Sequence, residues 1–141
     1  MYSVNDIALE TWQVTGLQTR VATLGEGPVA LFIHGWPECW YCWREDMPGF
    51  GETASLPEIS DYNVVRICAF MQELVEQANA GEPVLLIGHD WGAINCWQFV
   101  QRHPEMVSRL INMSVPLRPV ADVPPIEFLR GYFGENFFYQ I

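Results

Sequence analysis

Gly88-His89-Asp90-Trp91-Gly92 is the stretch that decides the fold of this 141-residue chain. It follows an apolar run over residues 83–87, which is typical of a buried parallel strand, and it opens a helical pattern over residues 91–102. A glycine, a nucleophile and a second glycine at this spacing form a tight turn between a strand and a helix. Larger residues in place of Gly88 and Gly92 would collide with the neighbouring strand and helix. The stretch therefore predicts a nucleophile turn with Asp90 at its centre.

An aspartate at this position predicts a particular kind of chemistry. A carboxylate attacks an sp³ carbon and forms an ester, which water must then cleave at its carbonyl carbon. The amino end of the following helix favours the carboxylate and any anion that develops there. The alternative is an aspartate that only caps the helix, and the G-x-D-x-G pattern alone does not decide between the two interpretations.

A second motif favours the catalytic interpretation. His34-Gly35-Trp36-Pro37 follows another buried apolar run over residues 29–33. The carboxyl ends of parallel strands are where ligands bind in such sheets, so the two motifs should lie together. The backbone N–H groups of Trp36 and Trp91 would then form an oxyanion hole for ester hydrolysis. We expect the His34 ring to brace its own turn, and His89 to point away from the Asp90 side chain.

The remaining segments predict a parallel α/β sheet, because strand patterns alternate with helical ones. We expect strands over residues 11–14, 19–24 and 107–115, the start of a helix over 39–44, a loop over 47–57 and a helix over 63–79. The strand over 107–115 is expected to be buried like the runs over 29–33 and 83–87.

Composition limits the partners and the location. The net charge of −10 argues against nucleic acid and anionic membrane surfaces as partners. Cys39 and Cys42 form a C-x-x-C pair, but the pair lies in an aromatic run and has no second pair, so we interpret all four cysteines, including Cys68 and Cys96, as structural. We expect no metal and no cofactor. Free thiols and the lack of a signal-peptide pattern at the start predict a cytoplasmic protein.

Taken together, the motifs resemble those of epoxide hydrolases. The run from His34 to Glu38, followed by Trp40-Tyr41-Cys42-Trp43-Arg44, resembles their H-G-F-P-E-x-W-Y-S-W-R run. Residues 46–51 resemble their P-D-x-x-G-x-G loop, and 88–93 match their nucleophile turn. Phe137-Phe138-Tyr139-Gln140 resembles the start of their cap.

The resemblance implies an α/β-hydrolase fold, here a truncated parallel sheet with helices on both faces and the beginning of a helical cap. The core would be 1–115 and the start of the cap 116–141. It also implies a small apolar epoxide-like substrate, converted to a vicinal diol, with Asp90 as nucleophile and Tyr139 as one of two tyrosines that protonate the ring oxygen.

Two other interpretations stay open. Haloalkane dehalogenases share the aspartate and the neighbouring tryptophan, although the aromatic run before Arg44 and the pair Tyr139-Gln140 favour the epoxide side. A fragment of an α/β-hydrolase without catalytic activity is the third possibility. The sequence does not indicate an oligomeric state.

Several expected parts are missing from the sequence. None of the three histidines is suitable as the base that activates water. His34 and His89 are expected to have the orientations given above, and His103 lies roughly 20 Å along the helix from Asp90. Arg44-Glu45 runs directly into Asp46, where the resemblance implies the rest of a helix and a strand, about 15–20 residues. That strand would lie between the amino-terminal hairpin and residues 29–33, so its loss would leave an open sheet edge or force the hairpin to close the gap. We therefore expect an incomplete chain with little or no turnover.

Overall fold

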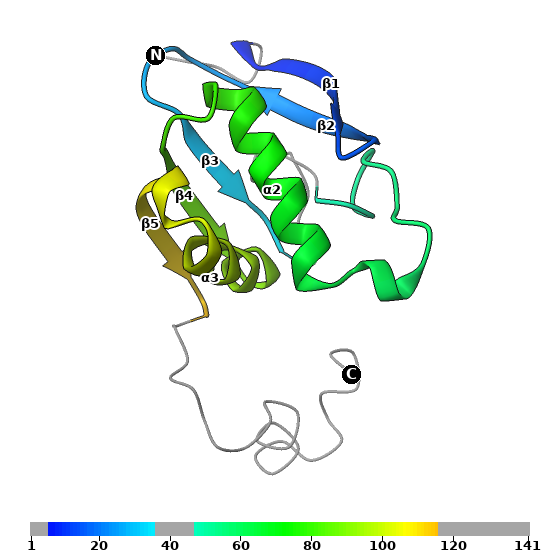
Figure 1. The fold of residues 1–141 in the computed structure, drawn as a ribbon. Helices are drawn as coiled ribbons and strands as arrows, with labels where there is room; N and C mark the ends of the chain where they lie inside the picture. Colours follow the sequence, from blue (N-terminus) through cyan, green and yellow to red (C-terminus); the bar gives the residue numbers. More distant parts are fainter. Residues whose placement is uncertain (1–5, 36–46, 116–141) are drawn as a thin grey trace, which may run out of the picture.

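The structure, a computed structural model, describes residues 6–35 and 47–115. These residues form a two-stranded sheet and a separate three-stranded sheet with two α-helices (Figure 1). The elements in chain order are β1 (Ala8–Val14), β2 (Leu17–Thr23), β3 (Ala30–Ile33), the 3-10 turn η2 (Ile59–Asp61), α2 (Val64–Asn79), β4 (Val84–His89), α3 (Trp91–Arg102), the 3-10 turn η3 (Pro104–Met106) and β5 (Val107–Met113). The strands β3, β4 and β5 lie in that order and are parallel. The predicted parallel α/β sheet is therefore confirmed.

The amino-terminal strands form a hairpin with a two-residue turn. Val14 pairs with Leu17, and the turn residues Thr15 and Gly16 have φ angles of 50° and 78°. Positive φ at both turn positions matches the twist of antiparallel strands, which explains a glycine in the second position. Both strands begin before the predicted residues, at Ala8 and Leu17, because cross-strand pairing runs from Ala8–Thr23 to Val14–Leu17. β2 ends at Thr23, one residue before the predicted end.

The helices begin and end close to where the sequence places them. Asn63 caps α2, since its side-chain oxygen accepts hydrogen bonds from the N–H groups of Val65 and Arg66, both at 3.1 Å. The chain leaves α2 through Ala80 and Gly81, which have φ angles of 49° and 81°. α3 has the predicted bounds. No helix within the described ranges is long and apolar enough to cross a membrane.

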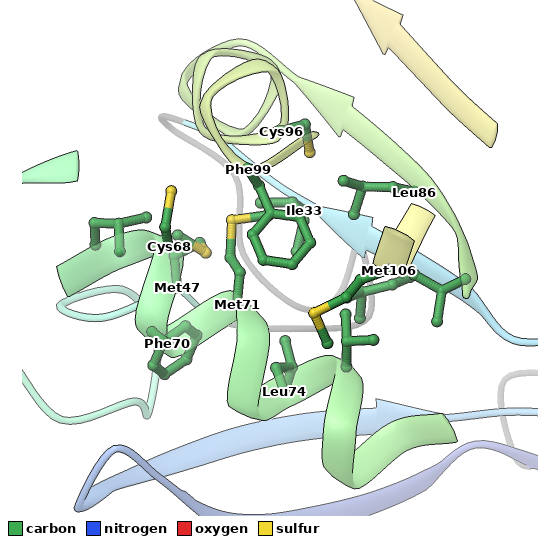
Figure 2. Close-up of a cluster of buried hydrophobic side chains, with 14 of the residues drawn as sticks. Ile33, Met47, Cys68, Phe70, Met71, Leu74, Leu86, Cys96, Phe99 and Met106 are labelled. Carbon is green, nitrogen blue, oxygen red and sulfur yellow. The ribbon is translucent and has the colours of Figure 1, made fainter. Parts of the chain in front are cut away.

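The hydrophobic core lies between the sheet and the two helices, which cover the same face (Figures 1 and 2). Fully buried side chains from the sheet and from both helices meet there: Ile33, Phe70, Met71, Leu74, Leu86, Cys96 and Phe99. Cys68 and Cys96 are buried, as predicted, whereas Cys39 and Cys42 lie outside the described residues. Burial raises the pKa of the Cys68 thiol, which is the response expected of a structural cysteine.

The strand β5 is less buried than predicted. Ile111 and Met113 are 49% and 40% exposed, because they belong to the face of the sheet that α2 and α3 do not cover. The apolar run predicted that β5 is buried on both faces of the sheet. Within the described residues, it is covered on one face. The helix expected to begin within 39–44 and the cap expected at 116–141 lie outside the described residues.

The hairpin does not close the gap next to β3. Within the described ranges β3 pairs with β4, and β2 pairs with β1, but β2 and β3 do not pair with each other. Of the two expected consequences of a missing strand, a hairpin that closes the gap is not observed, and within the described residues β3 pairs on one side only.

We predict that Asn63→Ala lowers the free energy of unfolding by about 1 kcal/mol, because two N–H groups of the first turn of α2 lose their acceptor. Chemical denaturation measures this change. Gln72→Ala, at a half-buried position of the same helix away from the cap, is the control and should change the free energy by less than about 0.5 kcal/mol. Equal effects of the two substitutions would contradict a role of the cap.

Candidate active site

Asp90 lies at a sharp turn between β4 and α3. Its φ and ψ angles are 53° and −123°, a combination that residues other than glycine rarely adopt. His89 ends β4, Trp91 begins α3, and the first helical hydrogen bond runs from the Ile94 N–H to the Asp90 carbonyl oxygen at 3.2 Å. The turn therefore directs the chain from the sheet into the helix within a single residue.

The two glycines of the motif allow close contact between backbone segments. A Cβ atom on Gly92 would overlap the carbonyl oxygen of Ile33 and lie 2.6 Å from that of His34. A Cβ atom on Gly88 would lie 2.7 Å from Asn112 Oδ1 and from Cys96 Sγ. The clashes that the sequence predicted therefore come from β3 for Gly92, and from β5 and α3 for Gly88.

The turn after β3 lies against the Asp90 turn. A Cβ atom on Gly35 would lie 2.5 Å from Asp90 Oδ1 and 2.7 Å from the Trp91 backbone nitrogen. The Asp90 carboxylate and the Trp91 N–H thus both lie close to Gly35, which has no side chain to hold them away. The structure brings together the predicted residues Gly35, Asp90 and Trp91, whereas Trp36 and Pro37, which follow directly in the chain, lie outside the described residues.

His34 holds this turn in place. Its ring is 1% exposed, Nε2 accepts a hydrogen bond from the Met47 N–H at 3.0 Å, and Nδ1 lies 3.0 Å from the Gly35 carbonyl oxygen. The two contacts require a neutral ring protonated on Nδ1. Phe50 packs edge-on against the ring, with centroids 5.1 Å apart. His34 therefore ties the turn after β3 to the loop that begins at Met47.

Asn112 supports the first turn of α3, a role that the sequence did not lead us to expect. Its Nδ2 donates to the Ala93 carbonyl oxygen at 2.9 Å, and its Oδ1 is buried beside Gly88. The amide thus links β5 to the first turn of α3. The sequence contained a signal for this role. Asn112 is a polar residue at the otherwise apolar carboxyl end of a strand, and that end of the sheet is where the Asp90 motif was expected.

The other histidines have separate environments. His89 is the last residue of β4 and shares a register position with Met113, on the face of the sheet that α2 and α3 leave uncovered. His103 lies beyond the far end of α3, where it stacks on Phe99 and its Nδ1 is 3.6 Å from Glu105. Tyr139, the predicted proton donor, lies outside the described residues.

A cavity of about 520 Å³ borders the Asp90 turn. Trp91 and Ile94 of α3 line it, together with His34 and Met47, and the exposed Trp91 side chain contributes at 40% exposure. The remaining lining residues are Pro48, Phe50, Tyr62, Asn63, Val64, Ile67, Asn95 and Gln98. The cavity wall is therefore mainly apolar, with a few amide and hydroxyl groups.

The arrangement matches that of a known family. The family model of the alpha/beta hydrolase fold matches residues 28–140. The chain belongs to the alpha/beta hydrolase fold family. This family is the one that the two turn motifs predicted, and its nucleophile stands at a strained strand-to-helix turn like that of Asp90.

Similar proteins include several epoxide hydrolases. Epoxide hydrolase 2 of Siraitia grosvenorii is 34% identical over 92% of this chain and 46% of its own length. Epoxide hydrolase A of Mycobacterium tuberculosis is 35% identical over 88% of this chain and 44% of its own length. The crystal structure of epoxide hydrolase VrEH1 from Vigna radiata superposes with a TM-score of 0.90 at 32% identity, over 98% of this chain and 48% of that one.

The chain spans about half the length of these relatives. The match to the Siraitia grosvenorii protein runs over 145 residues although 92% of this chain is only about 130 residues. About 15 positions of that match therefore have no counterpart in this chain.

We predict that Gly92→Ala lowers the free energy of unfolding by about 1–3 kcal/mol, because the added Cβ overlaps the Ile33 carbonyl oxygen. If α3 and β3 were not in contact at this position, the same substitution would raise the free energy of unfolding by roughly 0.5–1 kcal/mol, because alanine is favoured over glycine inside a helix. The sign of the measured change therefore distinguishes the two cases. Chemical denaturation gives the value. An increase in stability would show that α3 and β3 are not in close contact at Gly92.

Proposed function

We propose that this chain carries the nucleophile half of an epoxide hydrolase-type site, with Asp90 as the nucleophile. The observation that carries the proposal is the strained turn that holds the Asp90 carboxylate beside Gly35 and the Trp91 amide. The names of the similar proteins support it, since the relatives cited above are epoxide hydrolases.

In the proposed first step, an Asp90 carboxylate oxygen forms a bond to one epoxide carbon. The bond from that carbon to the ring oxygen breaks, and the electron pair stays on the oxygen, which takes up a proton. The product is a hydroxyalkyl ester on Asp90. We propose Tyr139 as a donor of that proton on the basis of the sequence resemblance.

In the second step, water would attack the ester carbonyl carbon and an oxyanion would form. The Trp91 N–H is at the free amino end of α3, where no carbonyl group of the helix accepts from it. We propose that it stabilises the oxyanion with the Trp36 N–H as its partner. A single donor of this kind is worth roughly 2.7–4 kcal/mol in the transition state.

We propose a small apolar epoxide as substrate. The cavity beside Trp91 and Ile94 supports this choice, because its wall is mainly apolar and its volume of about 520 Å³ suits a small ring-bearing molecule. A strongly anionic substrate is not expected, because the negative charge of the Asp90 carboxylate would repel it.

The second step needs a base for the attacking water, and the three histidines of this sequence do not supply one. His34 uses both ring nitrogens in holding its turn, and His103 lies at the opposite end of α3 from Asp90. His89 belongs to the sheet face away from the helices. We therefore expect a protein of these 141 residues to form the ester once and to release it slowly.

A haloalkane dehalogenase-like reaction is the alternative that uses the same nucleophile. In that reaction Asp90 would displace halide, and the Trp91 side chain next to it would bind the leaving ion. The exposed position of Trp91 is compatible with either role. Chloride release from 1-chlorobutane, measured beside epoxide consumption, separates the two activities.

We predict that styrene oxide adds one molecule to the protein, on Asp90, because this carboxylate is the one held at the helix amino end. Intact-mass spectrometry measures the adduct, and peptide mapping locates it. Asp90→Asn should lower the rate of addition at least about a hundredfold, whereas Asp6→Asn, at an exposed position near the amino terminus, should leave it unchanged.

Two outcomes would contradict the proposal. One is addition that maps to a cysteine or to an exposed acid and is equally fast in Asp90→Asn. The other is complete absence of addition by a protein whose circular dichroism and thermal melting show that it is folded, which would favour a fragment without catalytic activity.

A further inference from the structure

Asn112 connects a strand of the sheet to the start of α3. It lies in β5 beside Gly88 of β4, and its Nδ2 donates to the Ala93 carbonyl oxygen of α3 at 2.9 Å. A Cβ atom on Gly88 would lie 2.7 Å from Asn112 Oδ1 and 2.9 Å from the Ala93 Cα atom. The absence of a side chain at Gly88 therefore leaves room for the Asn112 carboxamide to reach the first turn of the helix.

The two ends of the Asn112 carboxamide have different environments. Nδ2 has an acceptor, whereas Oδ1 is buried and has no hydrogen-bond partner. The cost of burying an acceptor without a donor is at least as large as the net gain from one neutral hydrogen bond. The carboxamide as a whole therefore does not stabilise the fold relative to an apolar side chain of similar size.

The Ala93 carbonyl oxygen does not depend on Asn112 for a partner. Ala93 lies inside α3, and in an α-helix each carbonyl oxygen accepts from the N–H group four residues later. Removal of the Asn112 carboxamide would thus leave this carbonyl group paired within the helix, and it would also remove the unpartnered Oδ1. Stability alone does not explain an asparagine at this position.

The contact fixes the turn of α3 that begins at Asp90. The Ile94 N–H donates to the Asp90 carbonyl oxygen at 3.2 Å, so Ala93 lies within the turn that this hydrogen bond closes. The same turn approaches β3, where no side chain at Gly92 separates it from the Ile33 carbonyl oxygen. Because β4 lies between β3 and β5, the two contacts hold the turn from both sides.

We propose that Asn112 is a positioning residue for the Asp90 site. It acts through the Ala93 carbonyl oxygen and keeps the start of α3 at a fixed place on the sheet. The Asp90 carboxylate and the Trp91 N–H thereby keep their mutual orientation. Asn112 contributes to the rate of reaction at Asp90 and not to the stability of the fold. This inference rests on the proposed function, because the rate concerned is that of ester formation on Asp90.

The test is Asn112→Leu, which removes the carboxamide and keeps a side chain of similar size. Intact-mass spectrometry over a range of styrene oxide concentrations gives the maximal rate of addition to Asp90 and the half-saturating concentration. We expect the maximal rate to fall at least about tenfold, because the carboxylate is less well oriented, and the half-saturating concentration to change less than about twofold. The melting temperature should rise or stay within about 4 °C of the wild-type value.

A second measurement does not depend on any reaction at Asp90. Hydrogen exchange of the Ile94 amide, followed by NMR, reports opening of the first turn of α3, because this N–H is the donor of the hydrogen bond that closes the turn. Asn112→Leu should speed exchange of Ile94 at least about tenfold. Exchange of the Leu85 amide, which donates to the Val29 carbonyl oxygen on the side of β4 away from β5, should stay unchanged.

Asn79→Leu is the matched control variant. The Asn79 Nδ2 donates to the Glu82 carbonyl oxygen at 3.1 Å, just beyond the carboxyl end of α2. The substitution therefore removes the same kind of hydrogen bond and introduces the same side chain, but outside the lining of the cavity at Asp90. It should change neither the maximal rate of addition nor the exchange of Ile94 by more than about twofold.

Three results would overturn the proposal. The first is exchange of Ile94 that Asn112→Leu leaves unchanged. The second is a melting temperature below the stated range, or failure of the variant to fold, which would assign Asn112 a role in stability. The third is faster exchange of Ile94 without slower addition to Asp90.

Failure of the proposed function would give a different result. If the wild-type protein adds no styrene oxide, the proposed reaction at Asp90 is contradicted. Faster exchange of Ile94 in Asn112→Leu would then still support the positioning of the turn by Asn112, and unchanged exchange would overturn it.

Discussion

The contact on which the site depends is the direct approach of the first turn of α3 to the end of β3. At Gly92 no side chain separates the helix from the carbonyl oxygens of Ile33 and His34. This approach brings the Trp91 amide and the Asp90 carboxylate against Gly35. A larger residue at either glycine would move the helix away from the turn, and Asp90, the proposed nucleophile, would lose its position beside Gly35 and the Trp91 amide.

The strain at Asp90 requires support from the surrounding structure. A left-handed φ at an aspartate costs of order 1–3 kcal/mol. α3 offsets this cost through buried Ala93, Cys96 and Phe99, which are 0% exposed. The Asn112 amide fixes the first turn of the helix to β5, and His34 fixes the opposite turn to Met47. The two turns are thus held independently, from opposite sides of the site.

The sequence predicted the parts of the fold that depend on local pattern. The bounds of α3, the N-terminal end of α2 and the parallel sheet follow from periodicity, glycine positions and the alternation of strand and helix patterns. The exposure of β5 could not be predicted, because an apolar run does not reveal which neighbouring segments cover it. Asn112 stands out in the sequence as a polar residue at the apolar end of a strand, but its partner Ala93 is 19 positions away, so the local pattern does not identify the contact. The role of Trp36 remains a prediction from the position of its motif after a strand, and the role of Tyr139 remains a prediction from resemblance.

The turn at Asp90 places its carboxylate at the amino end of α3, beside Gly35 and the Trp91 amide. A crystal structure of the protein after reaction with styrene oxide tests this claim most directly. We expect an ester on Asp90 whose carbonyl oxygen lies about 2.7–3.1 Å from the Trp91 nitrogen. An ester whose carbonyl oxygen points away from α3, or a turn at Asp90 that has relaxed to an ordinary negative φ, would contradict it.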